Sequence, residues 1–323
     1  MRNWRRLHRD AVVVDGHMDT FMKALDEGKS WDDPQPSWQI DHPRLRRGGV
    51  DLQICAIYTP PRYQGAEAAL YASRMIGKVL EAERTGRGRT RIVRSRRELD
   101  GVGRGATALL ISIEGGLPLA GRLDMLDVFF ALGVRAMGLT HNPRTLLADG
   151  ATVERGRGLT ALGRDVVRRM DALGMVVDVA HLHPAGFGEL LRLARGPVVS
   201  SHTGFRRWLD IPRNLSDAQA KAVARTGGLV AIDFYPGHLL PGPGPVTLPR
   251  MVDQLEAVAD LVGVDHVGLG GDFDGIERTV TGLEDVSRTP RITRELVARG
   301  WTDREIRKVL GGNWMRVLKT VLR

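Results

Sequence analysis

The chain has 323 residues and 42% hydrophobic content, enough for a large core, and its length suits two average domains or one α/β barrel. Its net charge of +9 does not indicate a nucleic-acid partner, because 41 of its 47 basic residues are arginines scattered along the chain, and even the densest group, 84–97, lacks interleaved aromatic residues and is interpreted as solvated surface. One cysteine excludes an internal disulfide framework, the basic start lacks the apolar segment of a signal peptide, and no apolar run has membrane-spanning length, so we expect a cytoplasmic protein with no membrane partner.

Eight short apolar runs recur along the chain and predict β-strands. They are continuously apolar and rich in β-branched residues, as expected of strands covered on both faces. The runs are residues 11–15, 52–58, 108–114, 135–141, 175–181, 197–202, 229–234 and 266–273.

Amphipathic segments between most of these runs predict helices. Examples are residues 162–174 and 216–228, and the second begins with Ser216, which can cap a helix. Strand and helix alternating eight times predict an α/β fold of the (β/α)8 TIM-barrel type, with additional helices after about residue 289. Since no linker divides the chain, we expect residues 1–323 to form a single catalytic domain.

Polar side chains lie at or just after the C-terminal ends of six of the eight predicted strands. Barrel enzymes carry their sites at the C-terminal ends of the strands, so these side chains should share one rim. One histidine alone could be a hydrogen-bonded core residue, but four at the same rim favour a site. The residues are His17 and Asp19 after the first run, then Glu114, His141, His181, His202 and Asp272.

The remaining histidines are interpreted as structural or surface residues. A second His-x-Asp pair, His8 and Asp10, lies in a charged run before the first strand and is interpreted as solvated surface.

The ligand types at the rim indicate a hydrolytic metal centre. Nitrogen and oxygen ligands without sulfur fit zinc, with manganese, cobalt and iron as alternatives. Two ions about 3.5–4 Å apart would need a bridging carboxylate, and Glu114 is the only glutamate at the rim. A water held by the ions would titrate near neutrality and supply hydroxide.

Seven short motifs follow one another along the chain: DGHMDT, IEGG, LTHN, DVAH, SSHTG, IPRN and GGDFDG. In this order they resemble the membrane (renal) dipeptidase family, peptidase family M19 of the amidohydrolase superfamily. The segments 43–50, 158–181, 282–287 and 310–318 match as well, so the resemblance spans nearly the whole chain.

The resemblance implies two zinc ions per chain. His17 and Asp19 would hold one ion, Glu114 would bridge, and His181 and His202 would hold the other.

It also implies roles in binding and catalysis around the bridge provided by Glu114. His141 would polarise the scissile carbonyl and stabilise its oxyanion. Arg213 would bind the terminal carboxylate of the substrate as a bidentate fork. Asp272, with Asp274 as a rival, would bind near the substrate's free amino group and move a proton from the attacking water to the leaving amine. The implied function is a zinc-dependent dipeptidase that uses a metal-bridged hydroxide and accepts a C-terminal residue of D configuration.

Departures from the family's pattern lie near the expected substrate and not among the metal ligands. Met18, for example, stands where the family usually has asparagine. One alternative is therefore an amidohydrolase of the same scaffold that acts on an N-acyl amino acid, a lactone or a β-lactam. Another is a metal-poor barrel that binds a ligand or nucleic acid. The expected partner is a small dipeptide, and a homodimer is an alternative to a monomer.

Overall fold

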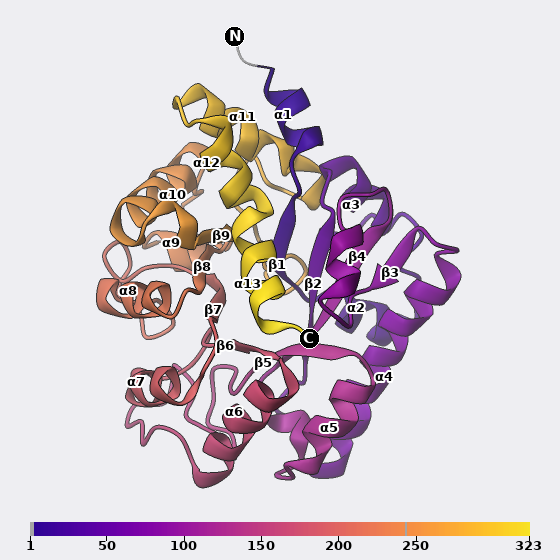
Figure 1. The fold of residues 1–323 in the computed structure, drawn as a ribbon, viewed down its shortest axis with the longest axis vertical. Helices are drawn as coiled ribbons and strands as arrows, with labels where there is room; N and C mark the ends of the chain where they lie inside the picture. The colour runs from indigo at the N-terminus through magenta and orange to yellow at the C-terminus, as the bar shows by residue number, and fades with distance from the viewer. Residues whose placement is uncertain (1–2, 243) are drawn as a thin grey trace.

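A ring of parallel strands forms the centre of the computed structural model, which describes residues 3–242 and 244–323 (Figure 1). Each strand pairs with its neighbour in the order β1-β2-β4-β5-β6-β7-β8-β9. All eight predicted strands are present, and the (β/α)8 barrel is confirmed. The strands are β1 (Val14–Met18), β2 (Leu52–Tyr58), β4 (Thr107–Glu114), β5 (Val134–Gly138), β6 (Val176–Asp178), β7 (Val198–Thr203), β8 (Leu229–Ile232) and β9 (Val267–Leu269).

The barrel closes between its first and last strands at the C-terminal rim. There the amide of Asp19 donates to the carbonyl of Phe273 at 3.0 Å, and the amide of Asp272 donates to the carbonyl of His17 at 3.1 Å. Met18 and Phe273 form the bridge between these bonds. Closure therefore fixes the segments that carry three of the predicted site residues.

Helices surround the ring and connect its strands (Figure 1). Ser216 caps α8 through a capping box, and α6 ends at Gly174 in the left-handed conformation that glycine favours. In the part of the chain that the structure describes, no helix has both the length and the apolar character to cross a membrane. The helices are α1 (Trp4–Asp10), α2 (Thr20–Asp26), α3 (His42–Gly48), α4 (Gly65–Thr85), α5 (Asp124–Ala131), α6 (Ala161–Leu173), α7 (Pro184–Leu193), α8 (Asp217–Arg225), α9 (Pro236–Leu239), α10 (Leu248–Val262), α11 (Pro290–Ala298), α12 (Asp303–Arg307) and α13 (Asn313–Val321).

The three C-terminal helices confirm the predicted extension of the barrel. Helix α13 crosses the front of the ring in Figure 1, and its Trp314 packs with the first residues of several strands, such as Val14 and Leu229. This helix therefore closes the N-terminal end of the barrel, so the open end is the C-terminal rim.

Alternation along the strands decides which side chains face the barrel interior. On β4, Ala108 and Leu110 belong to the interior cluster with Trp314, whereas Leu109 and Ile111 pack against the surrounding helices. Because side chains alternate with a period of two, Ser112 and Glu114 continue the inward series. The strand therefore delivers Glu114 to the mouth of the barrel.

The structure adds a strand that was not predicted and corrects one surface interpretation. The extra strand, β3 (Thr90–Ile92), lies in the arginine-rich segment 84–97 and pairs with the start of β4 outside the barrel order. Most arginines of this segment, such as Arg87 and Arg97, are exposed, as expected of solvated surface.

The surface interpretation of His8 is wrong. His8 is buried in α1, with Nε2 2.9 Å from the carbonyl of Gly48 and Nδ1 2.7 Å from Thr293 Oγ1. Helix α1 packs against α11 (Figure 1), and the charged residues around His8 gave no sign of this contact in the sequence.

Candidate metal centre

Glu114 lies at the centre of the rim cluster, and its two carboxylate oxygens face different nitrogen atoms. Oε2 lies 3.6 Å from His17 Nε2. Oε1 lies 2.8 Å from His181 Nε2 and 3.7 Å from His202 Nε2. A carboxylate that turns one oxygen to each of two groups of nitrogens has the arrangement of a bridging ligand.

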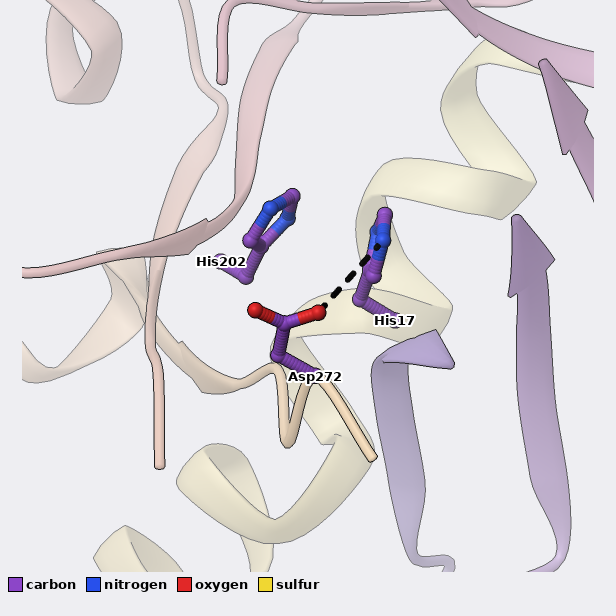
Figure 2. Close-up of side chains that lie close together, drawn as sticks. All are labelled: His17, His202 and Asp272. Atoms are coloured by element: carbon purple, nitrogen blue, oxygen red, sulfur yellow. Dashed lines mark ion pairs between the residues drawn. The ribbon is translucent and has the colours of Figure 1, made fainter. Parts of the chain in front are cut away.

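His17 and Asp19 form the group on one side of Glu114, at the end of β1. His17 Nε2 lies 3.5 Å from Asp19 Oδ2 and 3.9 Å from Asp272 Oδ1. Figure 2 shows the rings of His17 and His202 and the carboxylate of Asp272 converging on one region. Both His17 Nε2 and Asp19 Oδ1 are buried without a hydrogen-bond partner among the described residues. Because burying an unpartnered polar atom is costly, these atoms suit a bound cation.

His181 and His202 form the group on the other side. Their Nε2 atoms lie 2.9 Å apart. The opposite ring nitrogens are held by neutral groups, since Nδ1 of His181 lies 2.8 Å from Asn142 Oδ1 and Nδ1 of His202 lies 2.8 Å from Ser201 Oγ. These outer contacts turn both Nε2 atoms toward Glu114.

The electrostatics of the two groups differ. Burial lowers the pKa of His17, but the charges of Glu114 and a neighbouring aspartate outweigh it and raise this pKa well above its ordinary value. Burial keeps the pKa of His181 and of His202 well below the ordinary value, with help from Arg213 at His181. The group of His17 and Asp19 thus attracts positive charge, and the group of His181 and His202 offers neutral imidazoles. Both properties suit a divalent cation.

His141 lies three residues beyond β5, beside the second group. Its ring centroid is 4.3 Å from that of His181 and 4.6 Å from that of Tyr58. Burial lowers the pKa of His141, which favours a neutral ring. A neutral imidazole here could donate an N–H bond to a carbonyl oxygen at the mouth of the barrel.

Arg213 reaches the same cluster from the loop between β7 and α8, with 7% of its surface exposed. Its Nη2 donates to the carbonyl of His202 at 2.8 Å and lies 3.2 Å from His181 Nε2. Nε and Nη1 are buried with no partner among the residues described. A buried guanidinium with two unpartnered nitrogens suits an anionic ligand.

Asp272 lies in the site, three residues beyond the end of β9. Burial raises its pKa well above the ordinary carboxyl value, and the charges of Asp19 and Asp233 raise it further, while His17 acts in the opposite direction. A carboxyl group that binds a proton more readily than usual is suited to transferring one.

Asp274, the rival of Asp272, has a different environment. Its oxygens accept hydrogen bonds from Thr20 Oγ1 at 2.8 Å, from Lys23 Nζ at 2.7 Å and from the amide of Gln39 at 2.8 Å. These bonds tie the loop after β9 to α2 and to the segment before α3. Asp274 therefore holds the loop that carries Asp272, and its oxygens are already engaged.

Sequence reasoning missed several polar residues that support the cluster. Asn142 and Ser201 contact the two histidines described above, and Asp178 contacts Ser201. Asp233, fully buried after β8, accepts a bond from His238 Nδ1 at 2.5 Å. In the structure these aspartates and Ser201 continue the inward alternation of β6, β7 and β8, as Glu114 continues that of β4, but the sequence alone does not show which alternating set faces inward.

The donor set fits a metal centre built from nitrogen and oxygen. Within each of three overlapping groups, the potential ligand atoms all lie within 4.8 Å of one another. The groups are His17, Asp19 and Glu114; His17, His202 and Asp272; and Glu114, His141 and His181.

Comparison with known proteins gives matches along the whole chain. The family model described as membrane dipeptidase (peptidase family M19) matches residues 1–323. A protein of Schizosaccharomyces pombe described as an uncharacterized dipeptidase is 38% identical over 214 residues, which are 65% of this chain and 52% of that protein. Dipeptidase 3 of Mus musculus is 31% identical over an alignment of 326 positions that covers 98% of this chain and 65% of the mouse protein. The chain thus spans between about half and two thirds of these relatives.

A solved structure of a metallopeptidase has a similar fold. It is a metallopeptidase from Rhodobacter sphaeroides liganded with a phosphinate mimic of the dipeptide L-Ala-D-Ala. Its TM-score is 0.91 at 26% sequence identity, and the match covers 97% of this chain and 100% of the other.

Proposed function

Because the chain belongs to the membrane dipeptidase family, peptidase family M19, we propose that it is a metal-dependent dipeptidase that holds two zinc ions at the C-terminal rim of its barrel. The observation that carries this proposal is the orientation of Glu114, whose Oε2 faces His17 and whose Oε1 faces His181 and His202. In this proposal His17 and Asp19 hold one ion, His181 and His202 hold the other, and Glu114 bridges them.

The two ions would supply a water of low pKa, near neutrality, as the nucleophile. The residues of the chain would position the substrate and move the proton. His141, with a pKa lowered by burial, would donate an N–H bond to the scissile carbonyl oxygen and hold the negative charge that develops there. Asp272 would take the proton of the attacking water and deliver it to the amide nitrogen, so that the peptide bond breaks to a free carboxylate and a free amine.

Recognition of both termini would restrict the substrate to a dipeptide. The unpartnered nitrogens of Arg213 suit the terminal carboxylate. In this proposal Asp272 lies near the free amino group of the substrate. The L-Ala-D-Ala mimic bound by the Rhodobacter sphaeroides enzyme supports a C-terminal residue of D configuration for this chain as well.

The proposal is tested by metal analysis of the protein after expression with zinc, followed by a screen of dipeptides in both configurations. We expect about two ions per chain and hydrolysis of free dipeptides. A protein with no bound metal would contradict the binuclear site. Bound metal without dipeptide hydrolysis, together with activity on an N-acyl amino acid, a lactone or a β-lactam, would favour the alternative amidohydrolase.

A further inference from the structure

The ring of His202 is held from behind by a buried chain of polar groups. Figure 2 shows the ring beside His17 and Asp272, and its Nδ1 lies 2.8 Å from Ser201 Oγ. The backbone amide of Ser201 donates to Asp178 Oδ1 at 3.0 Å, so this carboxylate holds the residue that carries the hydroxyl. We propose that Ser201, held in place by Asp178, is a positioning residue whose hydroxyl fixes the ring of His202 for metal binding. This inference rests on the proposed metal centre.

Asp178 is anchored by the pairing of two neighbouring strands. It ends β6, and its Oδ1 accepts bonds from the amide of Ser201 at 3.0 Å and from the amide of Ala180 at 2.9 Å. Only 7% of its surface is exposed. Burial raises the pKa of Asp178, and the bonds from Ser201 and Ala180 oppose that shift because they favour the charged form. The carboxylate therefore sits at a fixed place beside β7.

The chemistry of metal binding sets the direction of the bond between His202 and Ser201. A neutral imidazole carries one proton, and a metal ligand must keep a lone pair on the nitrogen that binds the ion. In the proposed centre that nitrogen is Nε2 of His202, which lies 3.7 Å from Glu114 Oε1. Nδ1–H of His202 therefore donates to the hydroxyl oxygen of Ser201. Metal-binding histidines commonly donate their second N–H to a neighbouring acceptor, and here the acceptor is a hydroxyl.

The two histidines of the second group therefore differ in their support. Nδ1 of His181 lies against the amide oxygen of Asn142 in the loop after β5, whereas Nδ1 of His202 lies against a hydroxyl whose residue is held by buried Asp178. If Ser201 acts as proposed, loss of its hydroxyl should weaken metal binding through His202 more than it destabilises the fold. A purely structural role at the junction of β6 and β7 would lower thermal stability and leave metal affinity unchanged.

Ser201→Ala and Ser200→Ala form a matched pair for the test. Ser200 precedes Ser201 on β7, is fully buried, and its Oγ has no hydrogen-bond partner among the residues that the structure describes. Zinc would be removed from each purified full-length variant, and zinc affinity would then be measured by competition with a chromophoric chelator. Unfolding temperatures of the metal-free proteins would be recorded alongside.

We expect Ser201→Ala to bind one of its two zinc ions ~10–100-fold more weakly than the wild type, the usual effect of losing an outer partner of a metal ligand. Ser200→Ala should match the wild type. Ser201→Thr, which keeps the hydroxyl, should retain most of the affinity, whereas Ser201→Val, which has the shape of threonine without the hydroxyl, should weaken binding of the same ion. Wild-type zinc affinity in Ser201→Ala, or in Ser201→Val if the former does not fold, would overturn the inference. Equal losses in the Ser200 and Ser201 variants would overturn it as well.

The same measurements separate this inference from the proposed function. A wild-type protein that binds two zinc ions but cleaves no dipeptide would contradict the function, while a selective loss in Ser201→Ala would still support the positioning role. A dipeptidase whose Ser201→Ala variant binds zinc as the wild type does would contradict the positioning role alone. A wild-type protein that binds no zinc would overturn both.

Discussion

Replacing Arg213 with methionine should remove the donors that we assign to the terminal carboxylate of the substrate. Nε and Nη1 of Arg213 are buried without partners among the described residues, so two N–H donors are available to an anion. Charge-assisted hydrogen bonds contribute ~1.5–3 kcal/mol each, so losing two should cost ~3 kcal/mol or more. At ~1.4 kcal/mol for each tenfold change, kcat/KM on dipeptides should fall at least ~100-fold.

The assay compares a dipeptide with its C-terminal amide, which carries no carboxylate. On the amide, kcat/KM of the Arg213→Met variant should be about as low as that of the wild type. Arg213→Lys should recover only part of the activity, because an ammonium is a point charge without the planar guanidinium. Arg207→Met is the matched control, since Arg207 lies in the same loop but pairs with Asp217 at the surface, and its kcat/KM should stay at the wild-type value.

Two results would refute this reasoning. If the wild type cleaves the amide as well as the free dipeptide, the site does not recognise a carboxylate. If Arg213→Met lowers activity on both substrates equally, Arg213 has a structural role, and the alternative amidohydrolase becomes the better proposal.

Three further predictions concern the bridge, the proton carrier and the N-terminal helix. Glu114→Ala should lose both metal ions and all turnover, and metal analysis that still finds two ions would remove Glu114 as the bridge. Asp272→Asn should keep the metals but lower kcat by ~10²–10⁴-fold, and normal turnover at saturating substrate would exclude Asp272 from proton transfer. Burial lowers the pKa of His8 in the folded protein. As pH falls, His8 therefore becomes protonated in the unfolded chain before it does so in the folded protein. The stability contributed by neutral His8 is thus complete above about pH 6.5 and lost below it. His8→Gln should therefore show a smaller drop in Tm than the wild type between about pH 7.5 and 5.5, and an unchanged drop would show that His8 does not contribute to the pH dependence of stability.

The sequence predicted the barrel because its strands are buried on both faces and so appear as continuous apolar runs. The rim residues followed from the same pattern, since the side chain that ends a run in a parallel barrel must lie at one common edge. Strand β3 escaped prediction because three residues in an arginine-rich segment carry too little apolar pattern to be recognised. His8 was misinterpreted because most residues of α1 are charged and only Leu7 and His8 are buried.

The supporting residues could not be assigned from the sequence because their role depends on which face of a strand points inward. Asp178, Ser201 and Asp233 are polar residues within or beside apolar runs. Without the register of the strands, nothing separates them from residues that contact the outer helices. The one-residue shift in pairing between β1 and β2 at Asp15 to Met18 illustrates the difficulty, since such a shift changes the face on which the following side chains lie.

Backbone conformation at the rim explains how several charged groups can be held so close together. Five non-glycine residues among those described have positive φ, and they include His181 at 64°, Asp272 at 56° and Asp274 at 68°. Such conformations cost ~1–3 kcal/mol each and persist only where the surroundings enforce them. Here the bonds to Asp274 enforce the loop, and a Cβ on Gly275 would overlap Asp19 Oδ2 and lie 2.5 Å from Asp272 Oδ1. The loop backbone thus packs directly against two carboxylates, so the convergence of the site is imposed by the fold before any ligand binds.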